Sequence, residues 1–545
     1  MSVSRTCVVV LFVFASLSAR GQFDGNVAAR TIYEQGEKAL SNGRYADAAA
    51  DYQKAISVDP NFAEAYQQYI FARYLELPLP KDQSETAPNP EEEKKAKSEA
   101  DNVTQSLVEL FQSLSQQHPD KAIYLWALGQ IYSENDPSRE EQYCRQAIQI
   151  DPNFAPGYSC LADIADLRGD DAQKIALLRK VMQLEPDSSE ADLAYVVADQ
   201  SDAKTFKDAT MQMIQRFPNS PNAAKALYWY AIHQSTKATE IEVLEQLHKQ
   251  FPPGKFAVSS VAAGKLFTLL DRTDPPKAQA LAREMHLANP KSEAWTAYSL
   301  YADTMAKANR EVKEKNLTVA LTTLQGMKAP NVYFDMTRKE LLSALALDES
   351  DKTSAAFSAL SMDYAKHPTD EVRAALVRYG AKLGKNSEQI EASIWSVIRA
   401  SSTPAIPFSL QDFSNGKQVS LADFRGHVVV VDFWFPNCGP CRESFPHLQK
   451  IAQKYKGQGL VVIAINGIEA QDSFVLPMLR SKGYDFIPLK GRQQWALDVY
   501  HVQAFPSTFL IGEDGRVYFR PHLYNDSDEH AVGLEIDELL SHSGN

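Results

Sequence analysis

Prolines recur through the first two thirds of the chain at a nearly constant spacing, and this spacing is the strongest constraint on the fold. Apart from one gap of 59 residues, successive members of the series stand 32–40 residues apart. Each follows a stretch with the apolar spacing of a helix, and proline just past a helix end prevents the helix from continuing. The series is Pro60, Pro119, Pro152, Pro186, Pro218, Pro252, Pro290, Pro330 and Pro368. We therefore predict a region of helical repeats over residues 26–398.

Two stretches of this region resemble the tetratricopeptide (TPR) repeat, a helix-turn-helix unit of about 34 residues. The first places small residues at helix crossings and an aromatic residue in the groove between repeats, at Gly36, Gly43, Ala48, Tyr52, Ala55 and Pro60. The second follows the same pattern at Tyr158, Leu161, Gly169, Leu178, Val181 and Pro186, and Asp-Pro-Asn-Phe occurs at both 59–62 and 151–154. The resemblance implies an all-α TPR-like solenoid with a concave surface for a protein or peptide. The alternative is a spacer that positions the C-terminal domain.

The gap of 59 residues accommodates one repeat and an insert at about residues 78–100. This segment contains several prolines and the charged run 91–95. We predict a solvated loop that runs into a helix.

The chain has only five cysteines in 545 residues, too few for a disulfide-rich scaffold. Cys144 falls at the aromatic core position of one repeat, and Cys160 falls in the first helix of the next. We expect both to be buried free thiols that pack as small hydrophobic groups. A disulfide between their helices stays open as the alternative.

The first 21 residues have the pattern of a cleaved secretory signal peptide. Arg5 supplies the basic start, residues 7–17 form a short apolar run, and Ala19-Arg20-Gly21 provides small residues for cleavage before Gln22. The run is shorter than a comfortable membrane span. We expect export to the periplasm or another extracytoplasmic compartment, with an uncleaved membrane anchor as the alternative.

The net charge of −13 argues against nucleic-acid binding.

After a linker at 399–407, the hydrophobic pattern changes from helical to that of an α/β domain over residues 408–541. The run 428–434 has the continuous β-branched and aromatic composition of a strand buried on both faces. The expected strands are 428–434, 460–465, 507–511 and 517–520, and the expected helices are 441–455, 472–482 and 492–500. Strands that alternate with helices indicate a layered α/β sheet.

This domain resembles the TlpA/ResA-type thioredoxin-like disulfide reductases from Ile406 to about Leu540. The resemblance rests on the motifs at 408–410, 423–426, 432–442 and 505–511, and on Pro446. It implies a thiol-disulfide oxidoreductase that needs no cofactor. Such an enzyme reduces disulfides of extracytoplasmic client proteins and receives electrons from a membrane thiol-disulfide donor.

The pair Cys438-Gly439-Pro440-Cys441 is the predicted redox-active disulfide. Cys438 ends the loop between a strand and a helix, where unpaired N–H groups and the helix dipole stabilise a thiolate. We therefore predict Cys438 as the nucleophile and Cys441, one turn later, as the resolving thiol. Pro440 stiffens the first helical turn without removing a needed donor.

The resemblance adds two catalytic residues and two supporting aromatic residues. Asp432 matches the buried carboxylate that shuttles a proton to or from the resolving thiol. Pro506 matches the cis-proline that presents backbone groups to an extended substrate, and cis geometry is accessible to such bonds. Trp434 and Phe505 support the site. The alternatives are a strand carboxylate without a catalytic role at Asp432 and a trans turn at Pro506.

Two positions depart from the family pattern. Asn437 stands where a Trp usually precedes the first cysteine, and Ser444 stands where a Glu usually follows the second, with Glu443 on a different helix face. We expect no metal at the cysteine pair, because a structural zinc site needs four ligands and no second C-x-x-C is near. His447 is expected at the surface.

Two other functions remain open from the sequence. A thiol peroxidase could use a related fold, although the residues before Cys438 lack its Pro-x-x-x-Thr-x-x-Cys pattern. A non-enzymatic TPR adaptor could use the thioredoxin fold as a binding module only.

Overall fold

The computed structural model describes residues 26–77, 90–133, 136–200, 202–331, 334–502, 504–519 and 529–542. The expected signal peptide and residues 78–89 of the expected insert lie outside these ranges. From Pro90 onward the insert is already the beginning of a helix. The chain divides into two compact units, Met1–Tyr230 and Ala231–Asn545, which are described separately.

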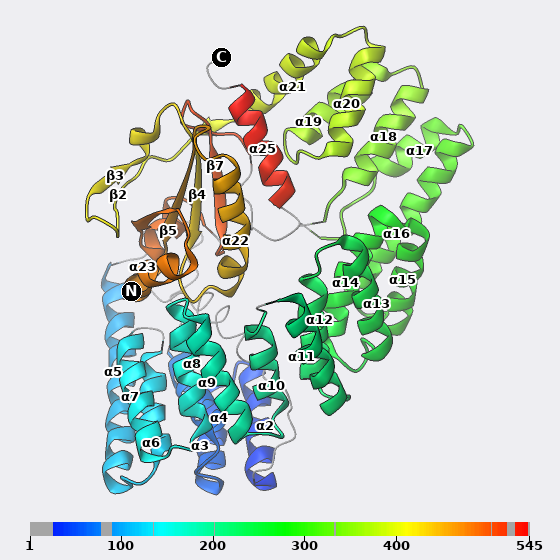
Figure 1. Cartoon of the computed structure of the whole chain (residues 1–545). Coiled ribbons are helices and arrows are strands. Elements are labelled where there is room, and N and C mark those ends of the chain that lie inside the picture. The colour runs from blue at the N-terminus through cyan, green and yellow to red at the C-terminus, as the bar shows by residue number, and fades with distance from the viewer. Residues whose placement is uncertain are drawn as a thin grey trace. The chain divides into compact units, whose positions relative to one another are not determined.

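The first unit is an array of helices in which successive members pack against each other (Figure 1). They are α2 Val27–Ser41, α3 Tyr45–Val58, α4 Ala63–Leu75, α5 Pro90–Gln117, α6 Ala122–Tyr132, α7 Pro137–Ile150, α8 Ala155–Leu167, α9 Asp171–Leu184, α10 Ser189–Ala198, α11 Ala203–Arg216 and α12 Pro221–Ile232. The helical character predicted from the proline spacing is therefore confirmed for this region.

The recurring Asp-Pro-Asn-Phe sequence forms the same hydrogen-bonded turn at both of its positions. The first aspartate accepts from the Asn61 N–H at 3.0 Å, and the second accepts from the Asn153 N–H at 2.9 Å. In each copy a tyrosine hydroxyl of the following helix donates to the proline carbonyl at 3.0 Å. These tyrosines are Tyr66 and Tyr158. The sequence repeat is therefore also a structural repeat.

Helix crossings in this unit depend on residues without bulky side chains. A Cβ at Gly36 would lie 2.7 Å from the ring of Tyr52, closer than real Cβ contacts come. The absence of a side chain at Gly36 thus lets α2 and α3 approach each other, as the sequence pattern predicts.

Cys144 and Cys160 are joined by a disulfide between α7 and α8. Both side chains are buried. The expectation of two free thiols was therefore wrong. Helix and burial could be predicted from the sequence, but bond formation depends on the distance between Cα atoms across the turn, which is 6.4 Å and lies in the bonding range.

The second unit begins with further helices and ends in an α/β domain. Its helices before the sheet are α13 Lys237–Gln250, α14 Ala257–Thr273, α15 Pro275–Ala288, α16 Glu293–Lys313, α17 Leu317–Gln325, α18 Thr337–Glu349, α19 Thr353–Tyr364, α20 Asp370–Lys382 and α21 Ser387–Ser401. Among the described residues, no helix is both long and apolar enough to cross a membrane.

The α/β domain is built on a mixed six-stranded sheet in the order β1-β8-β7-β4-β5-β6. Strands β4, β5 and β6 are parallel, whereas β7 is antiparallel to β4. The strands are β1 Thr403–Pro404, β4 Val428–Trp434, β5 Leu460–Asn466, β6 Ile487–Lys490, β7 Ser507–Ile511 and β8 Arg516–Val517, and β2 Ser409–Gln411 pairs with β3 Gln418–Ser420 separately. The helices are α22 Gly439–Lys454, α23 Asp472–Lys482, α24 Gln493–Asp498 and α25 Glu529–Ser541, with short 3-10 turns η1 Leu421–Phe424 and η2 Glu469–Gln471. This is the expected thioredoxin-like α/β fold.

The segment predicted as a linker belongs to the packed structure. Helix α21 continues to Ser401, and Thr403–Pro404 then pairs with Arg516–Val517 as an edge strand. Arg516 also donates to the hydroxyl of Ser402 at 2.7 Å and to its carbonyl at 2.6 Å. The linker prediction failed because a two-residue strand is too short to leave a periodic pattern in the sequence.

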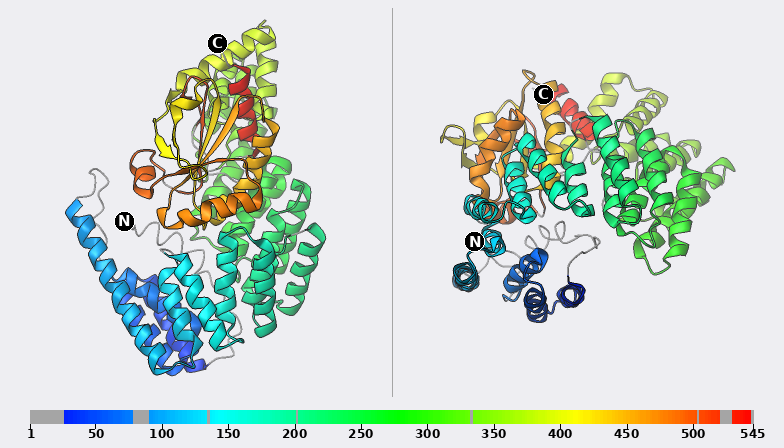
Figure 2. Two further views of the ribbon diagram at one scale, coloured as in Figure 1. Left: turned by 60° about the vertical axis from the view of Figure 1, so that its left-hand side comes forward. Right: turned by 60° about the horizontal axis from the view of Figure 1, so that its bottom comes forward.

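Helix α25 of the α/β domain lies beside the preceding helices of the same unit (Figure 2). Its buried Glu538 contacts two of them. Glu538 accepts from the Tyr364 hydroxyl at 2.8 Å, and the guanidinium of Arg373 lies 3.0 Å from the same carboxylate oxygen. A buried carboxylate needs such partners, because desolvation of an unpaired charge is costly.

Aromatic stacking extends this contact. The Trp395 ring of α21 stacks on Tyr518 at 5.1 Å and on His542 at 4.3 Å between ring centroids.

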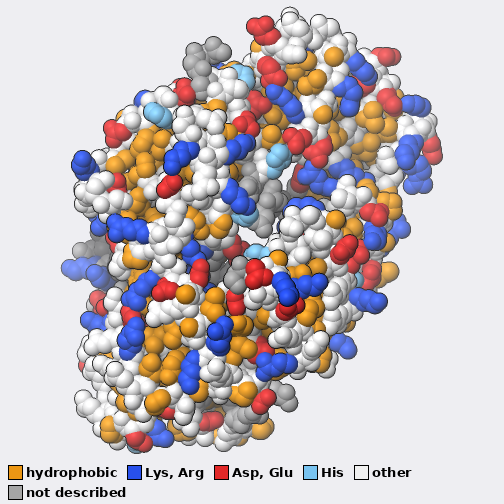
Figure 3. All heavy atoms as spheres, in the orientation of Figure 1, with side chains coloured by type: hydrophobic (Ala, Val, Ile, Leu, Met, Phe, Trp, Pro, Cys, Tyr) orange, Lys and Arg blue, Asp and Glu red, His pale blue; other side chains and the backbone are white. Residues whose placement is uncertain are grey.

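On the face shown in Figure 3, acidic and basic side chains are interspersed, as expected for a solvated surface.

We predict that the disulfide of α7 and α8 stabilises the first unit. Replacing both Cys144 and Cys160 by Ala removes a crosslink between residues 16 positions apart. Loop-closure entropy then predicts a loss of about 3 kcal/mol in the free energy of unfolding. Chemical unfolding followed by circular dichroism measures this loss. Reductant should destabilise the native first unit but not the double variant, and equal stability of the two proteins would contradict the prediction.

Candidate redox site

The cysteine pair lies where the central strand of the sheet gives way to a helix. Strand β4 ends at Trp434, and α22 begins at Gly439 with Cys438 as its N-cap residue. The sulfur of Cys438 accepts from the Cys441 N–H at 3.2 Å. The predicted position of Cys438 at a helix N-terminus is confirmed. A sulfur in this position meets unpaired N–H groups and the positive end of the helix dipole.

Cys438 and Cys441 are joined by a disulfide, so the structure represents the oxidised form of the pair. Cys441 is fully buried, and Cys438 is 3% exposed. Pro440 lies in the first turn of α22 and is exposed. The two sulfurs are therefore held on one helical turn, as the C-x-x-C spacing requires.

Asp432 lies in the middle of β4, and its carboxyl is almost completely buried, at 1% exposure. One oxygen, Oδ1, accepts from the hydroxyl of Thr508 at 2.6 Å. The other oxygen, Oδ2, is buried and has no hydrogen-bond partner within the described structure. Burial raises the pKa of Asp432 to about 7, while the Thr508 hydrogen bond acts in the lowering direction. The group can therefore gain or lose a proton near neutral pH.

Strand alternation places Asp432 on the face of the sheet that carries α22. Trp434, two residues further on, points to the same face and packs on Phe445 of α22 at 4.6 Å between ring centroids. Phe433 points to the opposite face and packs on Tyr500 at 4.9 Å. Asp432 thus lies on the same face as the helix that carries Cys441.

The Phe505–Pro506 peptide bond is cis, the geometry expected from the family resemblance. The next residue, Ser507, is the register partner of Phe433, near the end of β4. Pro506 therefore lies at the edge of the sheet from which the loop to Cys438 departs. The ring of Phe505 occupies the space beside Gly467, where an added Cβ would lie 2.5 Å from it.

The two positions that depart from the family pattern have local structural roles. The backbone N–H of Asn437 donates to the side-chain oxygen of Gln471 at 2.7 Å, and this bond holds the loop before Cys438. Ser444 is buried, and its hydroxyl donates to the carbonyl of Cys441 at 2.8 Å. Ser444 is thus a neutral neighbour of the resolving cysteine.

Three residues of the site were not assigned by sequence reasoning. They are Thr508, Gln471 and Gly467. Thr508 belongs to the recognised motif at 505–511, but its bond to Asp432 depends on the β4–β7 register. Gln471 and Gly467 come from the segment after β5 and carry no motif that could have marked them.

The described residues contain one group with metal-ligand geometry, and it does not include the cysteines. Glu391, Glu538 and His542 place one ligand atom each within 4.8 Å of one another. The guanidinium of Arg373 contacts both glutamates. The Arg373 guanidinium thus already balances the negative charge of the two glutamates, and we assign no metal there. His447, expected at the surface, is partly exposed.

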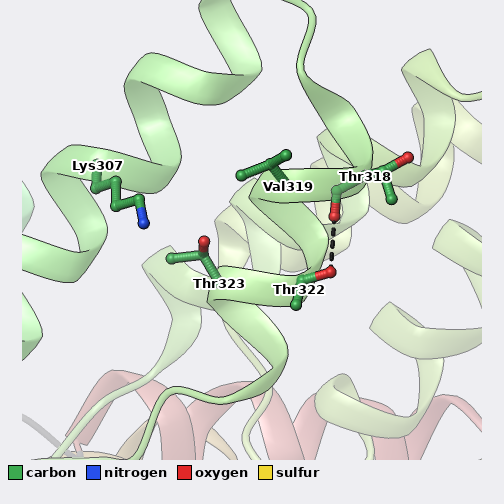
Figure 4. A pocket seen from close by; sticks show the side chains of 5 residues that line it. All are labelled: Lys307, Thr318, Val319, Thr322 and Thr323. Atoms are coloured by element: carbon green, nitrogen blue, oxygen red, sulfur yellow. Dashed lines mark hydrogen bonds between the residues drawn. The ribbon is translucent and has the colours of Figure 1, made fainter.

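A hollow of about 320 Å³ opens beside helix α17 (Figure 4). Lys307 of α16 and Thr318, Val319, Thr322 and Thr323 of α17 line it. The Thr322 hydroxyl is engaged with the carbonyl of Thr318 at 2.9 Å. The lining has no thiol, carboxylate or imidazole, so it contributes nothing to thiol chemistry.

We predict that Asp432 makes the stability of the second unit depend on pH. The carboxyl has a pKa of about 7 in the folded state and about 3.9 when unfolded. The folded state therefore binds more protons in between, and stability falls as the pH rises from 4 through 7. Asp363 of the same unit also has a pKa raised to about 6, so part of the slope remains in any Asp432 variant. In Asp432→Asn the contribution of Asp432 to the slope should disappear, so the variant should gain roughly 4 kcal/mol in stability relative to the native protein between pH 4 and pH values above 7.

Urea unfolding of both proteins at a series of pH values measures this difference. Asp485→Asn, at an exposed carboxyl of the same domain, is the matched control and should keep the slope. Parallel stability curves for the native protein and Asp432→Asn would refute the prediction.

Comparison with known proteins places the C-terminal domain. Residues 400–532 match the family model described as Redoxin. Thiol-disulfide oxidoreductase ResA of Bacillus subtilis is 34% identical over 110 residues, which are 20% of this chain and 60% of that protein. The ResA of Halalkalibacterium halodurans is 31% identical over 113 residues, which are 21% of this chain and 63% of that protein. The chain thus spans about three fifths of the length of these curated relatives.

Solved structures show the same similarity at this end of the chain. A Chlorobium tepidum protein, provisionally described as thiol:disulfide interchange protein DsbE, is 31% identical with a TM-score of 0.24. The match covers 26% of this chain and 96% of that one. The thioredoxin domain of a Bacteroides vulgatus thiol-disulfide oxidoreductase is 25% identical with a TM-score of 0.22, and the match covers 25% and 96%. The C-terminal part of the chain is a Redoxin domain with relatives among the thiol-disulfide oxidoreductases.

Proposed function

We propose that the protein is an exported thiol-disulfide oxidoreductase that reduces disulfides of extracytoplasmic client proteins. The observation that carries this proposal is the disulfide at the N-terminus of α22, on the same sheet face as the buried carboxyl of Asp432. The ResA relatives are thiol-disulfide oxidoreductases, which supports this class of reaction. Export rests on the signal-peptide pattern of the first 21 residues.

The reaction begins from the reduced pair. The Cys438 thiolate attacks one sulfur of a client disulfide, so the client S–S bond breaks and a mixed disulfide forms. The displaced client sulfur leaves with the bonding electron pair and takes up a proton. The helix N-terminus favours the attacking thiolate because its N–H groups and dipole stabilise negative charge.

Resolution uses the second cysteine. Cys441 gives its proton to Asp432 and attacks the sulfur of Cys438 as a thiolate. The bond between Cys438 and the client breaks and the Cys438–Cys441 disulfide forms. The client sulfur leaves with the electron pair of the broken bond and takes up a proton from solvent, which gives the second client thiol. Two electrons pass from the pair to the client, and a membrane thiol-disulfide donor then reduces the pair again. Pro506 presents backbone groups to the extended client segment.

The helical region recruits or positions clients in this proposal. Its support is the repeated Asp-Pro-Asn-Phe turn and the close approach at Gly36, which are the features of TPR-like repeats. The packing of α25 against α19 and α20 also supports a fixed placement of the Redoxin domain against its neighbouring helices.

Substitution of each cysteine tests the assignment of roles. We predict that Cys438→Ser abolishes reduction of insulin disulfides, because a hydroxyl does not replace a thiolate nucleophile. Cys441→Ser should accumulate mixed disulfides with client proteins, because the second attack is lost. Non-reducing electrophoresis and mass spectrometry of the trapped species measure both effects. The double serine variant is the control and should capture no client.

Three measurements separate the proposed function from the alternatives. Full insulin reduction by Cys438→Ser would contradict the proposed mechanism. A non-enzymatic adaptor should alkylate at Cys438 with the rate of an ordinary thiol, whose pKa is about 8.5. A thiol peroxidase should consume hydrogen peroxide in the absence of a client disulfide.

A further inference from the structure

Thr508 is the direct partner of Asp432 across the sheet. The two residues are register partners of antiparallel strands β4 and β7, so their side chains leave the sheet on the same face. Thr508 is fully buried, and its hydroxyl donates to Oδ1 of Asp432 at 2.6 Å. Because the carboxyl accepts this bond at Oδ1 only, its two oxygens are not equivalent.

Few other polar groups surround the Asp432 carboxyl, so the hydrogen bond from Thr508 has a large effect on its pKa. The neighbour on β5 is Ala464, which offers no polar side chain. Strand β7 contributes the Thr508 hydroxyl, and α22 carries the Cys438–Cys441 pair. Helix α25 packs against β4 and α22 and carries the buried Glu535. The influences resolved on the pKa of Asp432 are burial and the bond from Thr508, without a charged neighbour.

We propose that Thr508 is a positioning residue that holds Oδ1 of Asp432 and reserves Oδ2 for proton exchange with the resolving thiol. This inference rests on the proposed function of the cysteine pair. In the resolving step the proton leaves the sulfur of Cys441 and bonds to Oδ2, while Oδ1 keeps the hydrogen bond from Thr508. The sulfur electron pair then forms the S–S bond, and the client sulfur leaves with the electrons of the broken bond.

The hydroxyl also sets how readily the carboxyl loses its proton. A hydrogen bond donated to a carboxylate stabilises the ionised form. Without it, the ionised carboxyl would have no hydrogen bond within the described structure, so its pKa would rise further above the usual range. The carboxyl would then remain protonated at neutral pH and could not accept the proton of Cys441.

Thr508→Val tests this role, because valine keeps the shape of threonine and removes the donor. The carboxyl of Asp432 is titrated in the oxidised full-length protein by carbon-13 NMR with labelled aspartate. Asp432→Asn identifies its signal. We predict an upward shift of about one pKa unit in Thr508→Val, which corresponds to the loss of one hydrogen bond to a charged group.

Two variants control the titration. Thr508→Ser keeps the hydroxyl and should titrate as the native protein does. Ser507→Ala removes a neighbouring hydroxyl, which donates to the carbonyl of Ala504 at 2.7 Å, and should leave the Asp432 titration unchanged. If Thr508→Val does not fold, Thr508→Ala supplies a second variant without the donor. An unshifted titration in a folded variant without the donor would overturn the proposal.

A kinetic measurement tests the link to the reaction. A mixed disulfide between Cys438 and a model peptide is prepared, and its resolution by Cys441 is followed in single turnovers across pH. The rate should rise with pH as Asp432 ionises. In Thr508→Val the midpoint of this rise should lie about one pH unit higher, a tenfold lower proton concentration. Thr508→Ser should restore the native profile. A shifted titration with an unshifted rate profile would overturn the positioning role.

The measurements distinguish this proposal from the proposed function. If Asp432→Asn keeps the native rate profile, the proton role of Asp432 in the proposed function is wrong, whatever the titration shows. If the double serine variant resolves the mixed disulfide, the roles of the cysteines are wrong. The titration of the oxidised protein depends on neither result.

Discussion

The site depends on the burial of β4 on both faces. All seven residues of this strand are buried, and Asp432 is its only ionisable member. A carboxyl in such a strand cannot be solvated, so its protonation is set by the few groups that reach it. The same strand delivers the chain to the loop that ends at Cys438. One buried element therefore fixes both the acid and the start of the helix that carries the thiols.

Much of this arrangement could be predicted from the sequence because its signals are local. A β-branched run predicts β4, C-x-x-C after it places Cys438 at a helix N-terminus, and the motif around Pro506 predicts the cis bond. The partner of Asp432 could not be predicted in this way, because the Thr508 contact follows from strand register between segments 76 positions apart. The bond from Asn437 to Gln471 likewise joins distant segments.

The two wrong predictions, free thiols at Cys144 and Cys160 and a linker at 399–407, have a related cause. Burial of Cys144 and Cys160 followed from their helical positions, whereas their bond depends on how closely two helices approach. The expected linker contains a two-residue strand whose pairing with Arg516–Val517 is decided by the distant partner. In both cases local composition was not enough, because a contact with another segment decided the structure.

The contact at Glu538 makes the orientation of the Redoxin domain against α19–α21 specific. A buried carboxylate shared by Tyr364 and Arg373 adds little net stability, since desolvation offsets most of the attraction. It does penalise any other arrangement, because separation of the surfaces by a small shift would leave a charge unpaired. Stacking of Trp395 between Tyr518 and His542 adds apolar burial to the same contact. The charged contact therefore makes the orientation of the Redoxin domain against α19–α21 specific, and the aromatic stacking contributes most of the stability of the contact.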